Sequence, residues 1–207
     1  MIARRKLFQL GLGAVGAGLL GPSAYAGPLT QAAPLTVGPV VQIAPEPDII
    51  GDLLAAPEPK WLALHNIHTE EKLDAVYWEN GAYVPDAVEA LNKVLRDHRT
   101  GEERAMDLQL FDLLSALHAK TETKSPFQVI SGYRSPASNA LLAERSGEVA
   151  KKSLHMDGKA MDIYLEDVAL DRLRAAALDI GRGGVGYYPD TKFVHVDVGP
   201  VRRWQGS

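Results

Sequence analysis

Two histidines and an aspartate in the last third of the chain have the types and spacing of a metal site. His195 lies in the segment 192–198, where polar and apolar residues alternate. Asp162 lies in a second alternating segment, 160–165, and His155 precedes it by seven residues in the turn-like SLHMDGKAMD. Two imidazoles and one carboxylate leave a fourth tetrahedral position open for water, as in catalytic zinc sites. These residue types therefore predict hydrolytic metal chemistry.

Strand periodicity places two of the three side chains on one face of a sheet. Side chains alternate along a β-strand, so His195 and Asp197 share one face and the intervening valines share the other. Asp162 lies opposite the apolar residues of its own strand, and it requires a cation because an unpaired buried carboxylate is costly. A single histidine in a strand is more often packed or hydrogen-bonded. On spacing alone that alternative stays open for His195.

The pattern around these residues predicts an α+β domain. We expect an antiparallel sheet with helices packed on one face and the metal site on the opposite face. Asn80-Gly81 is a hairpin signal, with one strand expected on each side of it. Further strands are expected at 126–131, 160–165, 183–189 and 192–198, and helices at 85–96, 106–120, from 135 onward, and at 168–179.

The N-terminal residues 1–26 predict an export signal. Arg4 and Arg5 precede an apolar run, and Ala24-Tyr25-Ala26 has the pattern of a cleavage site. The paired arginines favour the twin-arginine type, which leads to the periplasm. The apolar run is about 14 residues, against roughly 20 for a spanning helix, so no stable membrane span is expected after signal removal. Residues 27–60 predict a Pro/Ala-rich tether, and 61–207 the folded domain.

Charge and composition exclude several classes of function. Without residues 1–26 the chain has 19 basic and 26 acidic residues, which argues against a nucleic-acid partner. The absence of cysteine excludes a thiol nucleophile and a thiolate zinc site, so a metal must be held by histidine and carboxylate. No H-E-x-x-H, G-x-S-x-G or S-x-x-K motif occurs, which argues against zincins, common serine hydrolases and penicillin-binding proteins. His65 and His68, three residues apart in a predicted strand, are not expected to share a metal.

Three motifs together resemble a known class of enzyme. SGYRSPASN, His155-x6-Asp162 and GVGYYPDTKFVHVDVGPVRRW are similar to the D-Ala-D-Ala-carboxypeptidase class of zinc peptidases, and most similar to its murein endopeptidase K branch. The similarity extends from about residue 65 to 204 and includes LRDHRTGEERAMDLQLFDLL. It implies Zn²⁺ held by His155, Asp162 and His195. It also implies that Arg134 of SGYR binds a substrate carboxylate or stabilises the oxyanion. The planar guanidinium group of arginine, with its several N–H donors, suits either role.

Two roles remain open for Asp197. Relatives place a glutamate or histidine shortly before the last zinc histidine, where this chain has Lys192. Asp197 is expected to be either the general base or the partner of a zinc ligand, and Asp190 is a weaker candidate for the base. Ser153 is expected to shape the loop that carries the first zinc histidine, and Tyr188 to line the cleft.

The resemblance also implies a substrate, the peptidoglycan stem peptides. The expected reaction is hydrolysis of an amide bond in their cross-links, either D-Ala–diaminopimelate or diaminopimelate–diaminopimelate. Two alternatives stay open. One is a D,D- or L,D-carboxypeptidase that trims the same peptides, and the other is a zinc-containing cell-wall binding module without catalytic activity.

Overall fold

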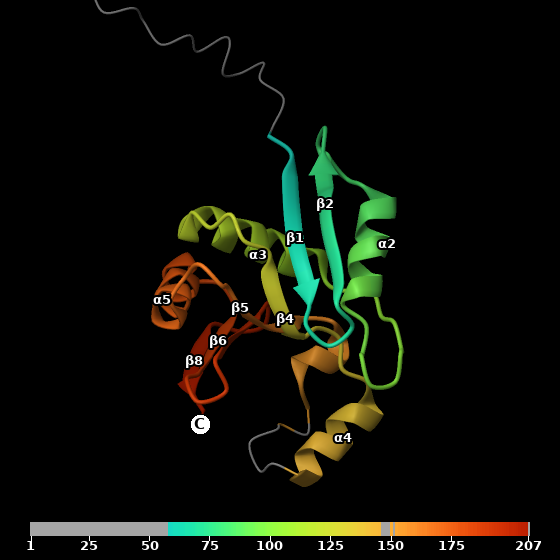
Figure 1. Ribbon diagram of the computed structural model, residues 1–207, viewed down its shortest axis with the longest axis vertical. Coiled ribbons are helices and arrows are strands. Elements are labelled where there is room, and N and C mark those ends of the chain that lie inside the picture. Colours follow the sequence, from blue (N-terminus) through green and yellow to red (C-terminus); the bar gives the residue numbers. More distant parts are fainter. Residues whose placement is uncertain (1–57, 146–149, 151, 207) are drawn as a thin grey trace, which may run out of the picture. The chain divides into compact units, whose positions relative to one another are not determined.

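A mixed sheet of eight strands organises the part of the chain that the computed structural model describes, residues 58–145, 150 and 152–206 (Figure 1). The predicted export signal and almost all of the predicted tether lie outside the described residues. The first strand of the described residues begins at Lys60. None of the helices in the described ranges has the length and apolar character needed to cross a membrane.

Strands and helices are interspersed along the chain. In order, they are β1 (Lys60–Asn66), β2 (Glu71–Glu79), β3 (Ala82–Tyr83), α2 (Pro85–Val94), α3 (Leu108–Thr121), β4 (Phe127–Ser131), α4 (Pro136–Arg145), the 3₁₀ helix η1 (Leu154–Asp157), β5 (Ala160–Tyr164), α5 (Leu170–Ile180), β6 (Gly184–Tyr188), β7 (Phe193–Asp197) and β8 (Arg202–Gln205). The sheet has the order β3-β2-β1-β4-β5-β7-β6-β8. The predicted α+β class is confirmed.

The sheet is mixed and not purely antiparallel as expected. β1 pairs with β4, and β6 with β8, in parallel, while the other five pairings are antiparallel. Parallel neighbours need a crossover connection, and α2 and α3 together supply one between β1 and β4. The short strand β8, which the sequence pattern did not predict, extends the sheet beyond β6.

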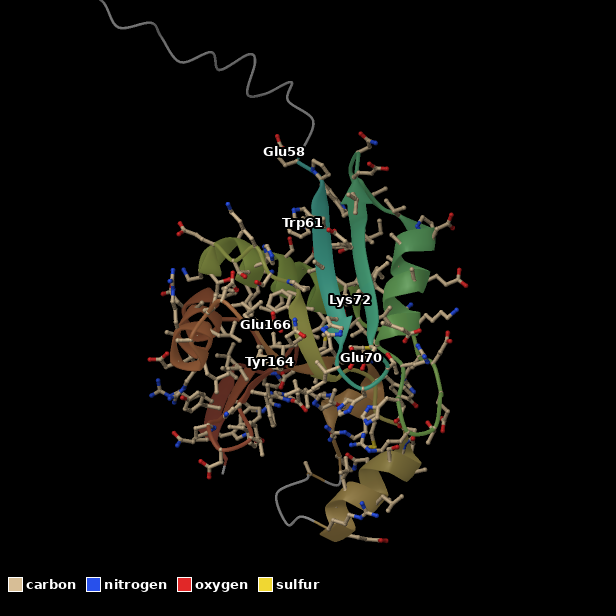
Figure 2. The ribbon with its side chains drawn as sticks, in the orientation of Figure 1. Glu58, Trp61, Glu70, Lys72, Tyr164 and Glu166 are labelled. Carbon is tan, nitrogen blue, oxygen red and sulfur yellow. The ribbon has the colours of Figure 1, made fainter. Side chains whose placement is uncertain are left out.

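The predicted hairpin at Asn80-Gly81 is confirmed, and a longer hairpin that was not predicted precedes it. The Asn80-Gly81 turn joins β2 to the two-residue β3, whereas the long β1–β2 pair turns between Asn66 and Glu71 (Figure 2, where Glu70 marks this turn). The Asn66 side chain accepts hydrogen bonds from the backbone N–H groups of His68 and Thr69, at 3.0 and 3.4 Å. An asparagine side chain thus closes a turn that lacks the usual glycine signal.

The apolar face of the central strands forms the core. Met161 and Ile163 of β5 and Val194 and Val196 of β7 are buried in one cluster with apolar residues of α3 and α5. Helix α2 packs against β2, α3 against β1, and α5 against β6 and β7. Helix α4 stands apart from the sheet (Figure 1). The residues of opposite parity in β5 and β7 are thereby left for a site on the other side of these strands.

Candidate metal centre

The side chains of His155, Asp162 and His195 converge on one point. Asp162 of β5 and His195 of β7 are directly paired across the antiparallel ladder, and η1 brings His155 over them. His195 Nδ1 lies 2.8 Å from Asp162 Oδ1, and His155 Nε2 lies 3.2 Å from each of these two atoms. All three residues are buried. The structure thus brings together the three residues that were expected to hold a metal, in a geometry that could do so.

Each imidazole is held by a hydrogen bond from its other nitrogen. His155 Nδ1 lies 2.8 Å from the carbonyl oxygen of Gly132, and His195 Nε2 lies 3.0 Å from Asp197 Oδ2. A carbonyl and a carboxylate only accept hydrogen bonds, so these two nitrogens carry the protons. In the neutral rings, the lone pairs of His155 Nε2 and His195 Nδ1 then point at Asp162 Oδ1.

This donor set fits a zinc ion. Three acceptor atoms that face one another repel unless a cation lies between them, and only nitrogen and oxygen atoms take part. Ligand atoms about 2.0–2.1 Å from a tetrahedral zinc ion are roughly 3.3 Å apart, close to the spacing observed. Outer hydrogen bonds to a carbonyl and a carboxylate are the usual partners of metal-bound histidine.

The pKa values of the three groups reflect this crowding. Burial lowers the pKa of His155, which favours its neutral, metal-binding form. Burial alone would raise the pKa of Asp162, but the two imidazoles hold it well below its usual range. Burial alone would lower the pKa of His195, but hydrogen bonds with Asp162 and Asp197 raise it to about 9. A metal ion held by these three groups would compete with a proton on His195.

Local structure fixes the position of His155. The side chain of Ser153 caps η1 by accepting a hydrogen bond from the His155 N–H at 3.4 Å. Gly158 ends η1 with φ of 68°, and a Cβ there would lie 2.6 Å from the carbonyl oxygen of Ala105. Asp107, at the start of α3, donates its backbone N–H to the Gly158 carbonyl at 2.9 Å. The loop is therefore held against α3, with the Ser153 side chain capping its 3₁₀ helix.

Arg134 lies beside the candidate ligands. Its Nη2 donates to Asp162 Oδ2 at 3.3 Å and to Ser131 Oγ at 3.2 Å. Its Nε is buried and has no hydrogen-bond partner among the described residues. A bulge in β4 between Val129 and Ser131 shifts the register so that Ser131 pairs with Asp162. The guanidinium is thus fixed at the site with donors still unused.

A cleft of about 700 Å³ opens over the three ligands. Tyr188 is among its lining residues, and the Tyr188 hydroxyl accepts a hydrogen bond from Trp204 Nε1 at 2.9 Å. The Trp204 ring lies 5.1 Å from that of His195, and a Cβ on Gly186 would lie 2.6 Å from the indole. Gly186 pairs with both His195 and Trp204, so the missing side chain lets the indole pack beside the metal ligand.

The candidates for the general base lie away from the cleft lining. Asp197 is fully buried and accepts hydrogen bonds from His195, from the Gly184 and Gly199 N–H groups, and from Arg202. Burial alone would raise the pKa of Asp197, but these donors hold it well below its usual range. Asp190 is exposed and does not line the cleft. Of the two roles open for Asp197, this geometry supports that of partner to a metal ligand.

Sequence reasoning missed several residues of the cleft. Arg99, His68 and Trp204 line it together with the predicted residues. His68 lies in the β1–β2 turn, and its ring stacks on that of His98 at 3.8 Å. Arg99 comes from DHRTGEE, a polar connection to which no role was assigned. The only signals in the sequence were the long motifs that contain Arg99 and Trp204.

Comparisons with known proteins agree with this site. A family model described as peptidoglycan L,D-endopeptidase MepK matches residues 54–204. The chain is 39% identical to the peptidoglycan L,D-endopeptidase MepK of Escherichia coli K12 over 201 residues, 97% of this chain and 96% of that protein. It is 35% identical to the probable peptidoglycan L,D-endopeptidase MepK of Haemophilus influenzae over 161 residues, 77% of this chain and 87% of that protein. The resemblance to the murein endopeptidase K branch is thereby confirmed. The chain belongs to the family of peptidoglycan L,D-endopeptidase MepK.

Proposed function

We propose that this protein is a zinc-dependent endopeptidase that hydrolyses L,D cross-links between peptidoglycan stem peptides. The convergence of three acceptor atoms within 3.2 Å of one another, under an open cleft, carries the proposal. A diaminopimelate–diaminopimelate link joins an L-centre to a D-centre, whereas a D-Ala–diaminopimelate link joins two D-centres. The names of the relatives therefore favour the diaminopimelate–diaminopimelate bond over the D-Ala–diaminopimelate bond.

His155, Asp162 and His195 would hold the zinc ion. When bound, zinc would polarise the scissile carbonyl and lower the pKa of a water molecule to about 7. Gly132 and Asp197 orient the two imidazoles through the hydrogen bonds described above, so that each presents its unprotonated nitrogen. In this assignment Asp197 is a positioning residue.

Arg134 binds a negatively charged oxygen of the substrate or of the reaction intermediate. Its remaining N–H donors can take either a substrate carboxylate or the oxygen of the tetrahedral intermediate, and the contact with Asp162 fixes their direction. Tyr188, Ser153 and Leu154 line the same cleft as the candidate ligands.

His68 is assigned as the proton carrier. Among the described residues that line the cleft, Asp162 is the one carboxylate, and it belongs to the ligand set. His68 donates its Nε2–H to the carbonyl oxygen of Ile130 at 3.1 Å, which leaves the Nδ1 lone pair free to accept a proton.

Defined substrates test the proposal. Zinc-loaded protein is incubated with intact sacculi and with purified dimers cross-linked through an L,D or a D,D bond, and the products are separated by chromatography. We expect L,D dimers to be converted to monomers, and His195→Ala to lose both zinc and activity. Asp157→Asn, an exposed charge change in η1, is the matched control and should behave as wild type. Release of terminal residues without dimer cleavage would establish a carboxypeptidase instead, and binding without cleavage a binding module.

Export to the periplasm is the second part of the proposal. The motifs of residues 1–26 support a twin-arginine signal, and a cell-wall substrate requires export. Cell fractionation of the full chain and of an Arg4→Lys, Arg5→Lys variant tests this. Retention of the variant in the cytoplasm is expected, and equal export of the two proteins would contradict a twin-arginine route.

A further inference from the structure

A rigid loop between α2 and α3 reaches the wall of the cleft. The loop contains the DHRTGEE motif and is built around Asp97, whose side chain is 1% exposed. Asp97 Oδ1 accepts the Arg99 N–H at 2.9 Å, and the Asp97 carbonyl accepts the Gly101 N–H at 2.7 Å. The Asp97 N–H in turn donates to the Glu102 carbonyl at 2.9 Å. The loop therefore closes on itself and presents Arg99 outward.

The same aspartate fastens this loop to the SGYR segment. Asp97 Oδ2 accepts the backbone N–H of Ser135 at 2.8 Å, and the Tyr133 N–H donates to the Leu95 carbonyl at 2.8 Å. A Cβ on Gly132 would lie 2.5 Å from that carbonyl oxygen, so only glycine permits the close approach of the two segments. The two arginines, one on each segment, are thus held in a fixed relation.

Arg99 and Arg134 are two different cationic positions in one cleft. Arg134 is largely buried and pairs with Asp162. Arg99 is exposed, lines the cleft and, in the part of the chain that the structure describes, takes part in no ion pair or side-chain hydrogen bond. Burial and the charge of Arg99 lower the pKa of His98 to about 4, so this neighbour adds no further charge at neutral pH. Among the described residues, the Arg99 guanidinium therefore has no acceptor.

The charge of the cleft selects for anionic ligands. Its described lining has four basic residues, Arg99, Arg134, Lys152 and Arg202. Arg134 pairs with Asp162 and Arg202 with the buried Asp197, which leaves Arg99 and Lys152 without an ion-pair partner among the described residues. A cleft lined by one sign of charge concentrates ligands of the opposite sign. A diaminopimelate–diaminopimelate link contains such groups, because each diaminopimelate keeps the carboxylate of its D-centre outside the scissile amide.

We propose that Arg99 binds a diaminopimelate carboxylate outside the scissile amide, and so distinguishes stem peptides with this free carboxylate from those in which it is amidated. A guanidinium fork matches a carboxylate and has no acceptor for a carboxamide N–H. Arg134 serves the reacting group, and Arg99 serves the second carboxylate. This assignment rests on the proposed function, since it takes the cross-link as the ligand.

Measuring two proteins on each of two substrates tests the role of Arg99. Wild type and Arg99→Gln are compared on matched L,D-cross-linked dimers, one with free D-centre carboxylates and one with carboxamides. We expect wild type to have about tenfold higher kcat/KM on the free carboxylate, the size of one charged hydrogen bond. Arg99→Gln should lose this preference and cleave the amidated dimer as wild type does. Arg104→Gln, an exposed charge removal in the same connection but outside the cleft lining, should keep the preference.

The outcomes separate this assignment from the proposed function. An equal preference in wild type and Arg99→Gln, or no preference in wild type, would overturn the role of Arg99 while leaving the endopeptidase intact. Failure of wild type to cleave either dimer would contradict the proposed function. Calorimetric titration with the same two dimers then tests Arg99 by affinity, and equal Kd values of wild type for both would overturn its role as well.

Discussion

Replacing Asp197 by asparagine tests how the metal centre is built. Every group that Asp197 contacts is a donor: His195 Nε2, two backbone N–H groups and the Arg202 guanidinium. An asparagine amide must direct its NH₂ group toward some of these donors in either orientation. If the amide donates to His195 Nε2, the ring takes the other tautomer. Its proton then lies on Nδ1, the nitrogen that faces Asp162 and the proposed zinc ion.

The expected loss of zinc affinity follows from what hydrogen-bond partners of metal-bound histidines contribute. Loss of the group that orients a metal-bound histidine typically weakens metal affinity 10- to 100-fold. This corresponds to about 1.4–2.8 kcal/mol of zinc binding free energy. We therefore expect Asp197→Asn to bind zinc 10- to 100-fold more weakly than wild type, and to recover much of its activity when zinc is raised to saturation.

Competition with a chromophoric zinc chelator measures the affinity, with Asp157→Asn as the control. Asp197→Asn removes the negative charge that pairs with Arg202. Urea denaturation of the metal-free proteins shows whether the variant remains folded without this ion pair. A folded variant with wild-type zinc affinity would refute the tautomer argument. Loss of turnover at saturating zinc, with that affinity unchanged, would instead make Asp197 the general base.

Three further predictions concern the cleft and the stability of the domain. Gly158→Ala should lower the melting temperature and the zinc affinity, because the new Cβ would clash with a carbonyl oxygen. The control is Gly81→Ala, which is also at positive φ but in open space. It should cost about 1 kcal/mol of folding free energy and leave zinc binding unchanged. His68→Gln should retain zinc by metal analysis and lose turnover; unchanged kcat would remove it as proton carrier. Burial would raise the pKa of Asp112, but hydrogen bonds from Lys60 and Tyr83 lower it. The Asp112 carboxylate therefore stabilises the folded protein above about pH 4, the unfolded pKa, and this contribution is lost as the pH falls through the lower pKa of the folded state. The difference in unfolding free energy between wild type and Asp112→Asn should therefore shrink between about pH 5 and pH 2, and a constant difference would contradict the assignment.

Local patterns in the sequence were sufficient for part of the site. Period-2 alternation is a property of the extended backbone, so it placed Asp162 and His195 on the side of their strands opposite the core before any pairing was known. The same alternation predicted β5 and β7, and it supported the α+β class. The position of His155 depended on the family motif, because a loop has no periodicity from which to read direction.

Pairing and contact between distant segments were decided only by the tertiary structure. The register that sets Asp162 against His195, the bulge at Ser131 and the parallel strands all depend on how remote segments pack. The hydrogen-bond donors around Asp197, some of them backbone groups, are likewise brought together only by the fold. The sequence alone thus determined the chemistry available on each strand face. Folding determined which atoms meet, because hydrogen bonds and side-chain packing between segments far apart in the chain leave no local pattern.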